Sequence, residues 1–182
     1  MLRRSLLTSA IAASLLTTFS LPAFATQVYE TDLVIIGGGL SGLAAAQSAV
    51  DQGAKPIVLE KEAALGGGGN FPEGSLGVGT RYQKEHNINT TVDQVLTAAL
   101  QYHHYRADPH VLRVLIEESG KTIDWVMDKG AQMRGIRTMY PKDESLMTWH
   151  LFKGGAAGII QRFAKEVRAK GGTILTEPRP RN

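Results

Sequence analysis

The segment Asp32-Leu-Val-Ile-Ile-Gly-Gly-Gly-Leu-Ser-Gly42 determines the fold class of this chain. Its first half is a short apolar run rich in β-branched residues, which is typical of a strand buried in a parallel sheet. Its second half, Gly37 to Gly42, fits the pattern G-x-G-x-x-G, which leads from a strand into a helix at dinucleotide sites. We therefore predict a strand at 32–36 and a phosphate-binding turn directly after it.

The residues that follow this turn complete a strand–helix–strand unit. Ser41 to Gln52 carries a face of leucine and alanine and is followed by Gly53, so we expect a helix that ends there. Pro56 to Leu59 is a second apolar strand, and Glu60 follows it directly. The unit has the usual size of about 30 residues. It predicts an α/β fold of the Rossmann type with a central parallel sheet.

Each of the three motif glycines has its own physical reason. Gly37 permits the tight turn, Gly39 lets the main chain approach a pyrophosphate without a Cβ in between, and Gly42 lets the helix pack close to the strand. The helix N-terminus adds free N–H groups and the positive end of the helix dipole. Glu60 stands 23 residues after Gly37, where its carboxylate can accept hydrogen bonds from ribose hydroxyls and would repel the 2′-phosphate of NADP.

A second run of glycines, Gly66 to Gly69 with Asn70 after it, lies soon after Glu60. Twelve of the chain's 20 glycines fall between Gly37 and Gly79. A domain that binds NAD usually continues with a regular helix here, whereas bare main chain suits a second, larger part of a ligand. This favours FAD over NAD. An NAD-dependent dehydrogenase fragment and a surface loop without a ligand are the alternative interpretations.

Further helices and one strand are predicted in the rest of the chain. A capping box at Thr91 opens a helix, and Asp108 followed by proline opens a second one, which Gly120 is expected to end. The other predicted elements are a helical stretch at 123–127 that stops before Gly130, an amphipathic helix over 159–167 and a strand over 173–176.

Composition excludes several classes of function. The 182 residues contain no cysteine, which rules out a disulfide framework, a Cys-ligated zinc site and Cys-bound haem or iron–sulfur clusters in this polypeptide. The formal net charge of +3 is small and mixed in sign along the chain, so we expect no nucleic-acid partner. His103, His104 and His110 lack clear partners for a metal site, so we expect no bound metal. No G-x-S-x-G motif supports hydrolase chemistry.

Three other side chains each have two possible roles, one structural or solvated and one functional. His150 stands beside Trp149 and before a Lys-Gly-Gly segment. We expect a structural histidine, and a contact with a flavin or substrate is the alternative. Arg134 and Arg137 are expected to be solvated, and a carboxylate-binding pair is the alternative.

The first 25 residues have the features of an export signal. Arg3 and Arg4 precede an apolar stretch that is too short to span a bilayer, and Ala23-Phe-Ala25 is a small-x-small cleavage site. We predict cleavage after Ala25, which leaves residues 26–182 without a membrane anchor; a retained anchor is the alternative. The two arginines also fit a twin-arginine signal, which suits a protein that folds around its cofactor before export. This predicts a periplasmic protein.

Taken together, these residues are similar to a known family. Asp32 to Gly42, Val58 to Lys61 and Gly68 to Asn70 resemble the N-terminal part of the FAD-binding domain in the fumarate reductase/succinate dehydrogenase flavoprotein family. Its soluble, periplasmic fumarate-reductase-like members and its ketosteroid-dehydrogenase-like members are the most similar. A looser likeness covers Lys153 to Glu177. Because no histidine lies between Gly66 and Thr80, where membrane-bound members attach the flavin, the resemblance implies noncovalent FAD.

The resemblance also implies a function and a set of cofactor contacts. It implies a FAD-dependent oxidoreductase that reduces or dehydrogenates an activated carbon–carbon bond in a small molecule, for which an unsaturated acid is one candidate. Electrons would come from a separate haem protein or quinol-linked partner. The pyrophosphate would contact the first glycine turn, the ribose the end of the second strand, and the flavin the second glycine run. The implied residues are Gly37, Gly38, Gly39, Ser41, Gly42, Glu60, Lys61, Gly68, Gly69 and Asn70.

The family's capping domain and its catalytic arginine have no counterpart in these 182 residues. We therefore identify no catalytic residue and expect residues 26–182 to be the N-terminal part of a FAD-binding domain, truncated before the cap. A non-catalytic subunit or one half of a split enzyme, binding a dinucleotide, is the alternative.

Overall fold

The computed structural model of the chain describes residues 27–139 and 145–177. The chain divides into two units, Met1–Glu30 and Thr31–Asn182, and the elements described below belong to the second unit. The predicted export signal, residues 1–25, lies outside the described residues.

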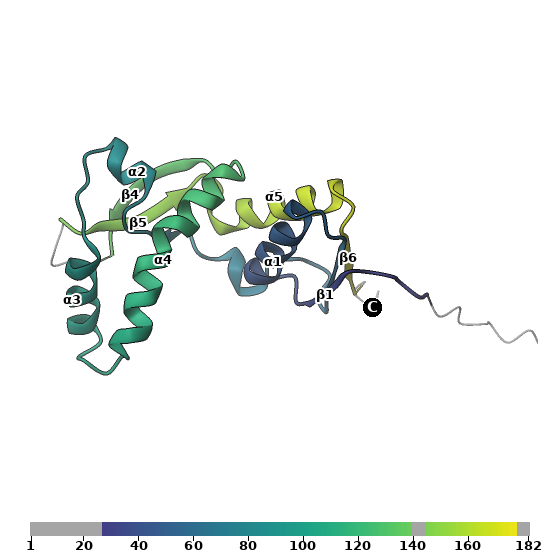
Figure 1. Cartoon of the computed structure of the whole chain (residues 1–182), viewed down its shortest axis with the longest axis horizontal. Coiled ribbons are helices and arrows are strands. Elements are labelled where there is room, and N and C mark those ends of the chain that lie inside the picture. Colours follow the sequence, from purple (N-terminus) through teal and green to yellow (C-terminus); the bar gives the residue numbers. More distant parts are fainter. Residues whose placement is uncertain (1–26, 140–144, 178–182) are drawn as a thin grey trace, which may run out of the picture. The chain divides into compact units, whose positions relative to one another are not determined.

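The described residues of the second unit form two three-stranded sheets and the helices that pack on them (Figure 1). The parallel sheet has the strand order β1-β2-β6, and the antiparallel sheet has the order β3-β5-β4. The elements are β1 Leu33–Ile36, α1 Leu40–Asp51, β2 Pro56–Glu60, the 3-10 helix η1 Gly67–Asn70, β3 Gly74–Leu76, α2 Arg81–Glu85, α3 Val92–Tyr102, α4 Pro109–Asp128, β4 Met133–Thr138, β5 Met147–Phe152, α5 Gly155–Ala169 and β6 Thr173–Thr176.

The predicted strand–helix–strand unit is confirmed in the parallel sheet. β1 pairs with β2 in parallel along its whole length, and β2 pairs in parallel with β6. On one face of this sheet, Val58 of β2 is fully buried against Ala46 and Val50 of α1 and Val167 of α5. Apolar side chains of two helices therefore cover this face of the sheet, which is the α/β arrangement expected from the sequence.

The prediction that β1 is buried is wrong. Successive strand residues point to opposite faces, and Ile35 faces the covered side, where it packs on the same cluster as Val58. Val34 and Ile36 face the other way and are 53% and 88% exposed. In the described part of the chain β1 is an edge strand. A continuous apolar run indicates a strand suited to burial on both faces, but what covers the second face depends on other elements.

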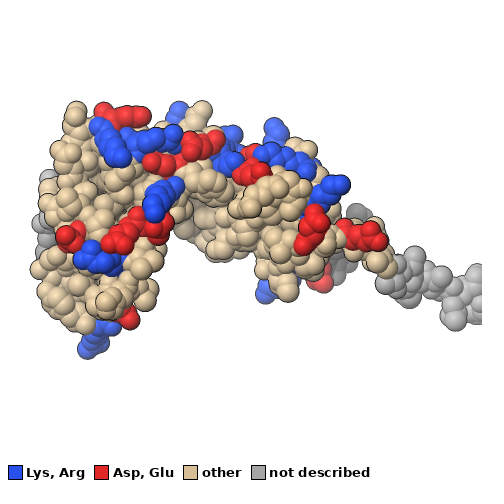
Figure 2. Space-filling view, in the orientation of Figure 1, with Lys and Arg blue, Asp and Glu red and all other residues tan. Residues whose placement is uncertain are grey.

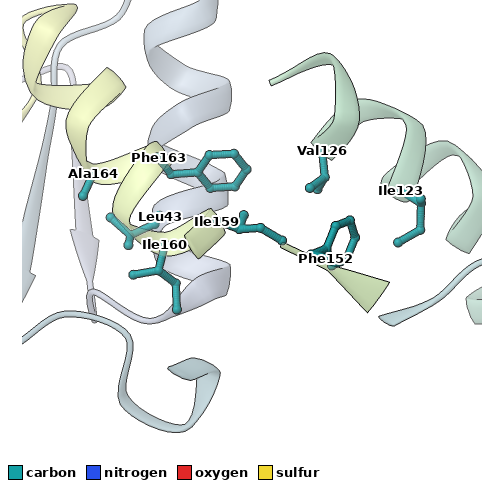
Figure 3. Packing of buried hydrophobic residues seen from close by; sticks show 8 residues of the cluster. All are labelled: Leu43, Ile123, Val126, Phe152, Ile159, Ile160, Phe163 and Ala164. Carbon is teal, nitrogen blue, oxygen red and sulfur yellow. The ribbon is translucent and has the colours of Figure 1, made fainter. Parts of the chain in front are cut away.

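One hydrophobic core connects the helices of the two sheets (Figure 3). α5 is central to it, because Phe163 and its neighbours reach both α1 and the end of β5. The buried members of this core are Leu43, Ile123, Val126, Phe152, Ile159, Ile160, Phe163 and Ala164. The two sheets are thus held together by apolar packing around one shared helix.

The expected helix break at Gly120 is wrong, because α4 is continuous from Pro109 to Asp128. A Cβ on Gly120 would overlap the carbonyl oxygen of Val78, so this glycine allows the helix to lie directly against the main chain that follows β3. The predicted start of this helical region at Asp108 and its predicted end near Gly130 are confirmed. The Asp108 carboxylate accepts the N–H of the helix's first turn, and Gly130, with φ +81°, follows the helix end.

Two other predicted helices also agree with the structure. The capping box is formed, because Thr91 accepts the N–H of Gln94 and the Gln94 side chain accepts the N–H of Thr91 at the start of α3. α5 begins one turn before the predicted helix and ends just before Gly171, which has φ +90°.

The antiparallel sheet was not predicted from the sequence. β5 pairs with β3 on one side and with β4 on the other. Its residues alternate between buried and half-buried, but polar side chains take two of the three buried positions. The buried residues are Thr148, His150 and Phe152, and the half-buried ones are Met147, Trp149 and Leu151. Such an order contradicts the usual pattern of apolar-in and polar-out, so the segment does not look like a strand.

Candidate dinucleotide-binding site

The first glycine turn joins β1 to α1 in a tight bend. Gly37 has φ +102°, and its N–H donates to the carbonyl oxygen of Leu59 on the neighbouring strand (2.7 Å). Gly39 is the N-cap residue of α1 and offers no side-chain cap. Ser41 lies in the exposed first turn of the helix. The N–H groups at this helix end are therefore free of any capping side chain, which leaves them available to an anionic ligand.

The three motif glycines are required for different reasons. Gly37 needs to be glycine because of its positive φ, and Gly42 because a Cβ there would overlap the carbonyl oxygen of Gly37. Gly39 has φ −73°, and a Cβ there would lie 3.7 Å from the Gly66 oxygen, an ordinary contact. The fold therefore requires glycine at Gly37 and Gly42 but not at Gly39, where only a ligand would meet the missing Cβ.

Both main-chain groups of Gly38 have partners within the chain. Its N–H donates to Oε2 of Glu60 (2.6 Å), and its carbonyl oxygen accepts the N–H of Gly66 (2.9 Å). A Cβ on Gly38 would lie 2.5 Å from Cδ2 of Leu65 and 3.1 Å from Cβ of Glu60. Sequence reasoning did not identify Leu65, because an apolar residue in a glycine-rich loop carries no motif. The main-chain N–H and carbonyl of Gly38 thus connect the first glycine turn to the end of β2 and to the second glycine run.

The Glu60 carboxylate is held by main-chain donors on both oxygens. Oε1 accepts the N–H of Glu62 (2.9 Å), and Oε2 accepts the N–H of Gly38. Hydrogen bonds from Glu62 and then Gly38 keep the pKa of Glu60 below its usual value, so the group is ionised near neutral pH. Each oxygen still has a lone pair for a further donor. A fixed carboxylate with spare acceptor capacity at a strand end suits two ribose hydroxyls.

The second glycine run lies beside the first turn. Gly39 and Gly66 form an isolated parallel bridge, so the two glycine clusters are adjacent, as the sequence-based hypothesis requires. Gly68 is exposed, and no atom lies within 4 Å of the position of a Cβ there. Its main chain is therefore open to a ligand.

Gly69 and Asn70 have structural partners within the chain. A Cβ on Gly69 would lie 3.2 Å from Cβ of Leu40 and 3.3 Å from Cδ1 of Ile160, which places it between α1 and α5. The Asn70 side chain folds back and donates from Nδ2 to the carbonyl oxygen of Leu65 (2.9 Å). Both residues shape the loop, and a ligand contact would come in addition to this role.

A pocket of about 340 Å³ lies at the carboxyl end of the parallel sheet. Open α/β sheets bind ligands at this end. The apolar part of the pocket comes from all three strands, and its polar part includes Glu60 and Glu177. The Lys61 side chain at its rim is 86% exposed and lies 4.0 Å from Glu62. The lining residues are Ile36, Leu59, Glu60, Lys61, Leu175, Thr176 and Glu177.

His150 lies away from this site, in the antiparallel sheet. It is fully buried, with Nε2 2.8 Å from Oγ1 of Thr80 and Nδ1 3.0 Å from the carbonyl oxygen of Thr148. Burial lowers the pKa of His150, so the ring is neutral near pH 7. A neutral ring donates from Nδ1 to the carbonyl and accepts from the Thr80 hydroxyl. These contacts favour the structural interpretation.

Arg134 and Arg137 both lie near a carboxylate of this chain. Their Nη2 atoms are 3.3 Å and 3.9 Å from Oε2 of Glu73, and all three side chains are exposed.

Among residues 27–139 and 145–177, no group of three His, Asp or Glu side chains could hold a metal ion. Within the same ranges, no helix combines the length and hydropathy needed to cross a bilayer. On the face drawn in Figure 2, basic and acidic side chains are interspersed.

Residues 32–177 match the family model described as FAD binding domain. The chain is 34% identical over 146 residues to the vinyl phenol reductase of Lactiplantibacillus plantarum, which covers 80% of this chain and 29% of that protein. The chain thus spans less than a third of that relative's length.

Two solved structures show the same fold. The open conformation of a flavocytochrome c3 fumarate reductase has a TM-score of 0.67 at 21% identity, over 80% of this chain and 26% of that one. The 3-ketosteroid-Δ4-(5α)-dehydrogenase from Rhodococcus jostii has a TM-score of 0.66 at 20% identity, over 84% of this chain and 39% of that one.

Proposed function

The chain belongs to the FAD-binding domain family, and from this premise we propose that its first glycine turn and Glu60 hold a noncovalent FAD. The observation that carries the proposal is the difference among the three motif glycines. Gly39 is bare although neither its φ nor its neighbours exclude a side chain. A pyrophosphate beside the uncapped start of α1 accounts for that missing side chain.

The rest of the cofactor follows from the positions of the other groups. The Glu60 carboxylate accepts the ribose hydroxyls, and the pocket at the strand ends takes the adenine, with Lys61 at the rim. Gly37, Gly38, Ser41 and Gly42 surround the pyrophosphate. The flavin lies near the open main chain at Gly68, with Gly69 and Asn70 beside it.

We further propose that the chain is the FAD-holding part of an oxidoreductase. When bound, FAD supplies hydride transfer, and the protein binds and orients it. The matched relatives include a protein named vinyl phenol reductase and a flavocytochrome named fumarate reductase. By analogy, the substrate is a small molecule with an activated carbon–carbon bond, such as an unsaturated acid, and the reaction is its reduction or dehydrogenation.

Residues 1–25 support a proposal about location and electron supply. The arginine pair, apolar stretch and small-x-small site are features of export signals. We propose a periplasmic protein that receives electrons from a separate haem protein or quinol-linked carrier. Cell fractionation tests this: the chain should be found in the periplasm, and changing both Arg3 and Arg4 to lysine should retain it in the cytoplasm if the twin-arginine route is used.

The test of the cofactor site compares Gly39→Ala with Gly135→Ala. Gly135 lies on β4, and no atom is within 4 Å of its added Cβ, so alanine fits there as well. We expect the unaltered chain to bind FAD with the visible bands of a bound flavin, and Gly39→Ala to weaken this binding at least about tenfold. The unfolding free energy of Gly39→Ala should change by less than about 1 kcal/mol, as for an N-cap change.

Two results would contradict the proposal. In the first, a folded chain takes up no added FAD. In the second, Gly39→Ala and Gly135→Ala bind FAD equally well. Uptake of NAD without FAD would instead support the dehydrogenase interpretation.

A further inference from the structure

The 3-10 helix η1 has three sides, and the chain itself occupies two of them. In a 3-10 helix, the side chains of residues three apart lie on the same side. A Cβ on Gly69 would lie 3.2 Å from Cβ of Leu40 and 3.3 Å from Cδ1 of Ile160, so this side of η1 packs on α1 and α5. The Asn70 side chain takes the second side, where it donates to the carbonyl oxygen of Leu65.

The third side of η1 carries an aromatic ring next to bare main chain. Phe71 is the C-cap residue with helical φ and ψ, and its N–H donates to the carbonyl oxygen of Gly68 (3.4 Å). The 3-10 geometry therefore puts Phe71 and Gly68 on one side. Among the described residues, no atom lies within 4 Å of the position of a Cβ on Gly68. We call this surface, formed by Gly68 and Phe71, the open side of η1.

The Phe71 ring is exposed although the main chain around it is fixed. Its exposed fraction is 84%, and of the large apolar side chains that the structure describes only Ile36 is more exposed. The Asn70 side chain ties one neighbour of Phe71 to the loop, and the carbonyl oxygen of Pro72 accepts the N–H of Ala156 at the start of α5 (2.9 Å). A single exposed apolar side chain is common on proteins. This one, however, stands on anchored main chain, so covering it costs little conformational freedom.

The open side also lies next to the turn proposed for the pyrophosphate. Gly66 is the N-cap of η1 and forms the bridge to Gly39. The ring system of a flavin is flat and aromatic, and such groups pack on aromatic side chains and on main chain without side chains. We propose that the open side of η1 faces the flavin of the bound FAD and that the Phe71 ring packs on it. This inference rests on the proposed FAD site and adds to it a binding residue outside the glycine motifs.

The first measurement is the dissociation constant for FAD, by calorimetric titration of the full chain. Phe71→Leu keeps an apolar side chain but removes the ring, and it should raise the constant about fivefold, the usual contribution of an aromatic pair. Tyr105, 69% exposed in the segment between α3 and α4, is the matched control. Tyr105→Leu removes another exposed ring and should leave the constant unchanged. Because both rings are exposed, neither change should alter unfolding of the chain without FAD.

The second measurement is flavin fluorescence, which reports contact and needs no enzymatic activity. An indole ring in contact with an excited flavin donates an electron to it and quenches its emission, and this effect disappears over a short distance. Phe71→Trp should still bind FAD and should lose most of the emission that the unaltered chain shows with bound FAD. Tyr105→Trp should leave this emission unchanged.

Two results would overturn the inference and leave the FAD site intact. In one, FAD binds but Phe71→Leu has no more effect on the dissociation constant than Tyr105→Leu. In the other, Phe71→Trp and Tyr105→Trp show the same emission with bound FAD. A chain that takes up no FAD contradicts the proposed function and this inference together. Weaker binding in Gly39→Ala without any effect at Phe71 contradicts the ring contact alone.

Discussion

Two glycine-containing segments, the turn after β1 and the strand segment around β3, use glycine differently. After β1, Gly42 makes room for the main chain of its own turn, and Gly39 is left bare with space beside it. Around β3, a Cβ on Gly74 would overlap the carbonyl oxygen of His150, and one on Gly77 would lie 2.8 Å from the His150 ring. The space beside the glycines of the second segment is thus filled by the protein itself, with His150 and Ile123 as the neighbours. A glycine indicates a ligand only where the fold itself leaves the space empty.

The largest expected effect tests the first turn. Gly42→Ala would force a Cβ onto the carbonyl oxygen of Gly37, a main-chain atom that cannot move aside. We expect a loss of about 3 kcal/mol in unfolding free energy, since overpacking against the backbone is at the upper end of such effects. Urea unfolding followed by circular dichroism measures it. Gly135→Ala is the control, and a loss below about 1 kcal/mol for Gly42→Ala would show that the turn can relax.

The second prediction tests the antiparallel sheet. His150→Ala removes one partner of the Thr80 hydroxyl, which remains bonded to Gln83, and leaves a cavity beside Gly77. We expect a loss of about 2 kcal/mol from the two lost hydrogen bonds and the lost packing. The exposed His86 stacks on Tyr82 at 4.0 Å, and its replacement by alanine should change stability by less than about 0.5 kcal/mol. Equal effects at the two histidines would contradict the buried network.

The third prediction concerns acid. Burial lowers the pKa of His150 below its ordinary 6.5; the hydrogen bond to the Thr148 carbonyl and then the charge of Asp124 oppose the shift without reversing it, and Thr80 and Tyr82 are the other neighbours of the ring. The unfolded state therefore binds a proton before the folded state does. Stability should be constant above pH 6.5 and fall below it, by at most about 1.4 kcal/mol per pH unit, until the folded pKa is reached.

Measurement between pH 7.5 and 5.0 isolates this effect from Glu60, whose pKa is lowered from 4.5 and whose contribution is lost only at lower pH. The slope should be absent in His150→Ala. A slope that survives this substitution would assign the acid sensitivity to other groups.

The smallest effect tests an ion-pair cluster that joins α1 to α4 and α5. The Asp51 carboxylate lies 2.6 Å from Nζ of Lys129 and 2.7 Å from Nζ of Lys170. Burial raises the pKa of Asp51, but hydrogen bonds from Lys129 and Lys170 outweigh this and lower it overall. Asp51→Asn should cost below about 1 kcal/mol, because the pairs are near the surface. The difference from the unaltered chain should shrink in 1 M salt, and a larger, salt-independent loss would contradict a mainly ionic role.

Local patterns predicted the elements whose signals lie within a few residues. The capping box at Thr91 and the Asp108-Pro109 start depend on side chains that bond to their own helix. The turn at Gly37 and the closeness of Gly42 to it are likewise contained in one short segment. Predictions were wrong where a contact with a distant segment determined the local structure. Gly120, for example, does not end α4 but lies against the main chain at Val78.

The candidate site was predictable for the same reason, with gaps that have physical causes. The motif and the acid after the next strand identified Gly39 and Glu60. They could not show that Gly38 donates to Glu60 or that Leu65 packs on the turn, because these contacts need the two strands side by side. β5 was missed because two polar side chains, Thr148 and His150, take buried positions of the strand, and the His150 ring is held there by hydrogen bonds.

The sequence by itself determined the strand–turn–helix around Gly37, the parallel α/β class and the family, because backbone dihedrals, helix capping and the order of apolar residues are encoded in neighbouring residues. Only the tertiary structure decided that Gly39 is the motif glycine with no structural need, that His150 packs against the glycines around β3, and that Val34 and Ile36 of β1 are exposed. These properties depend on contacts between segments that are distant in the sequence, and such contacts form only when the chain has folded.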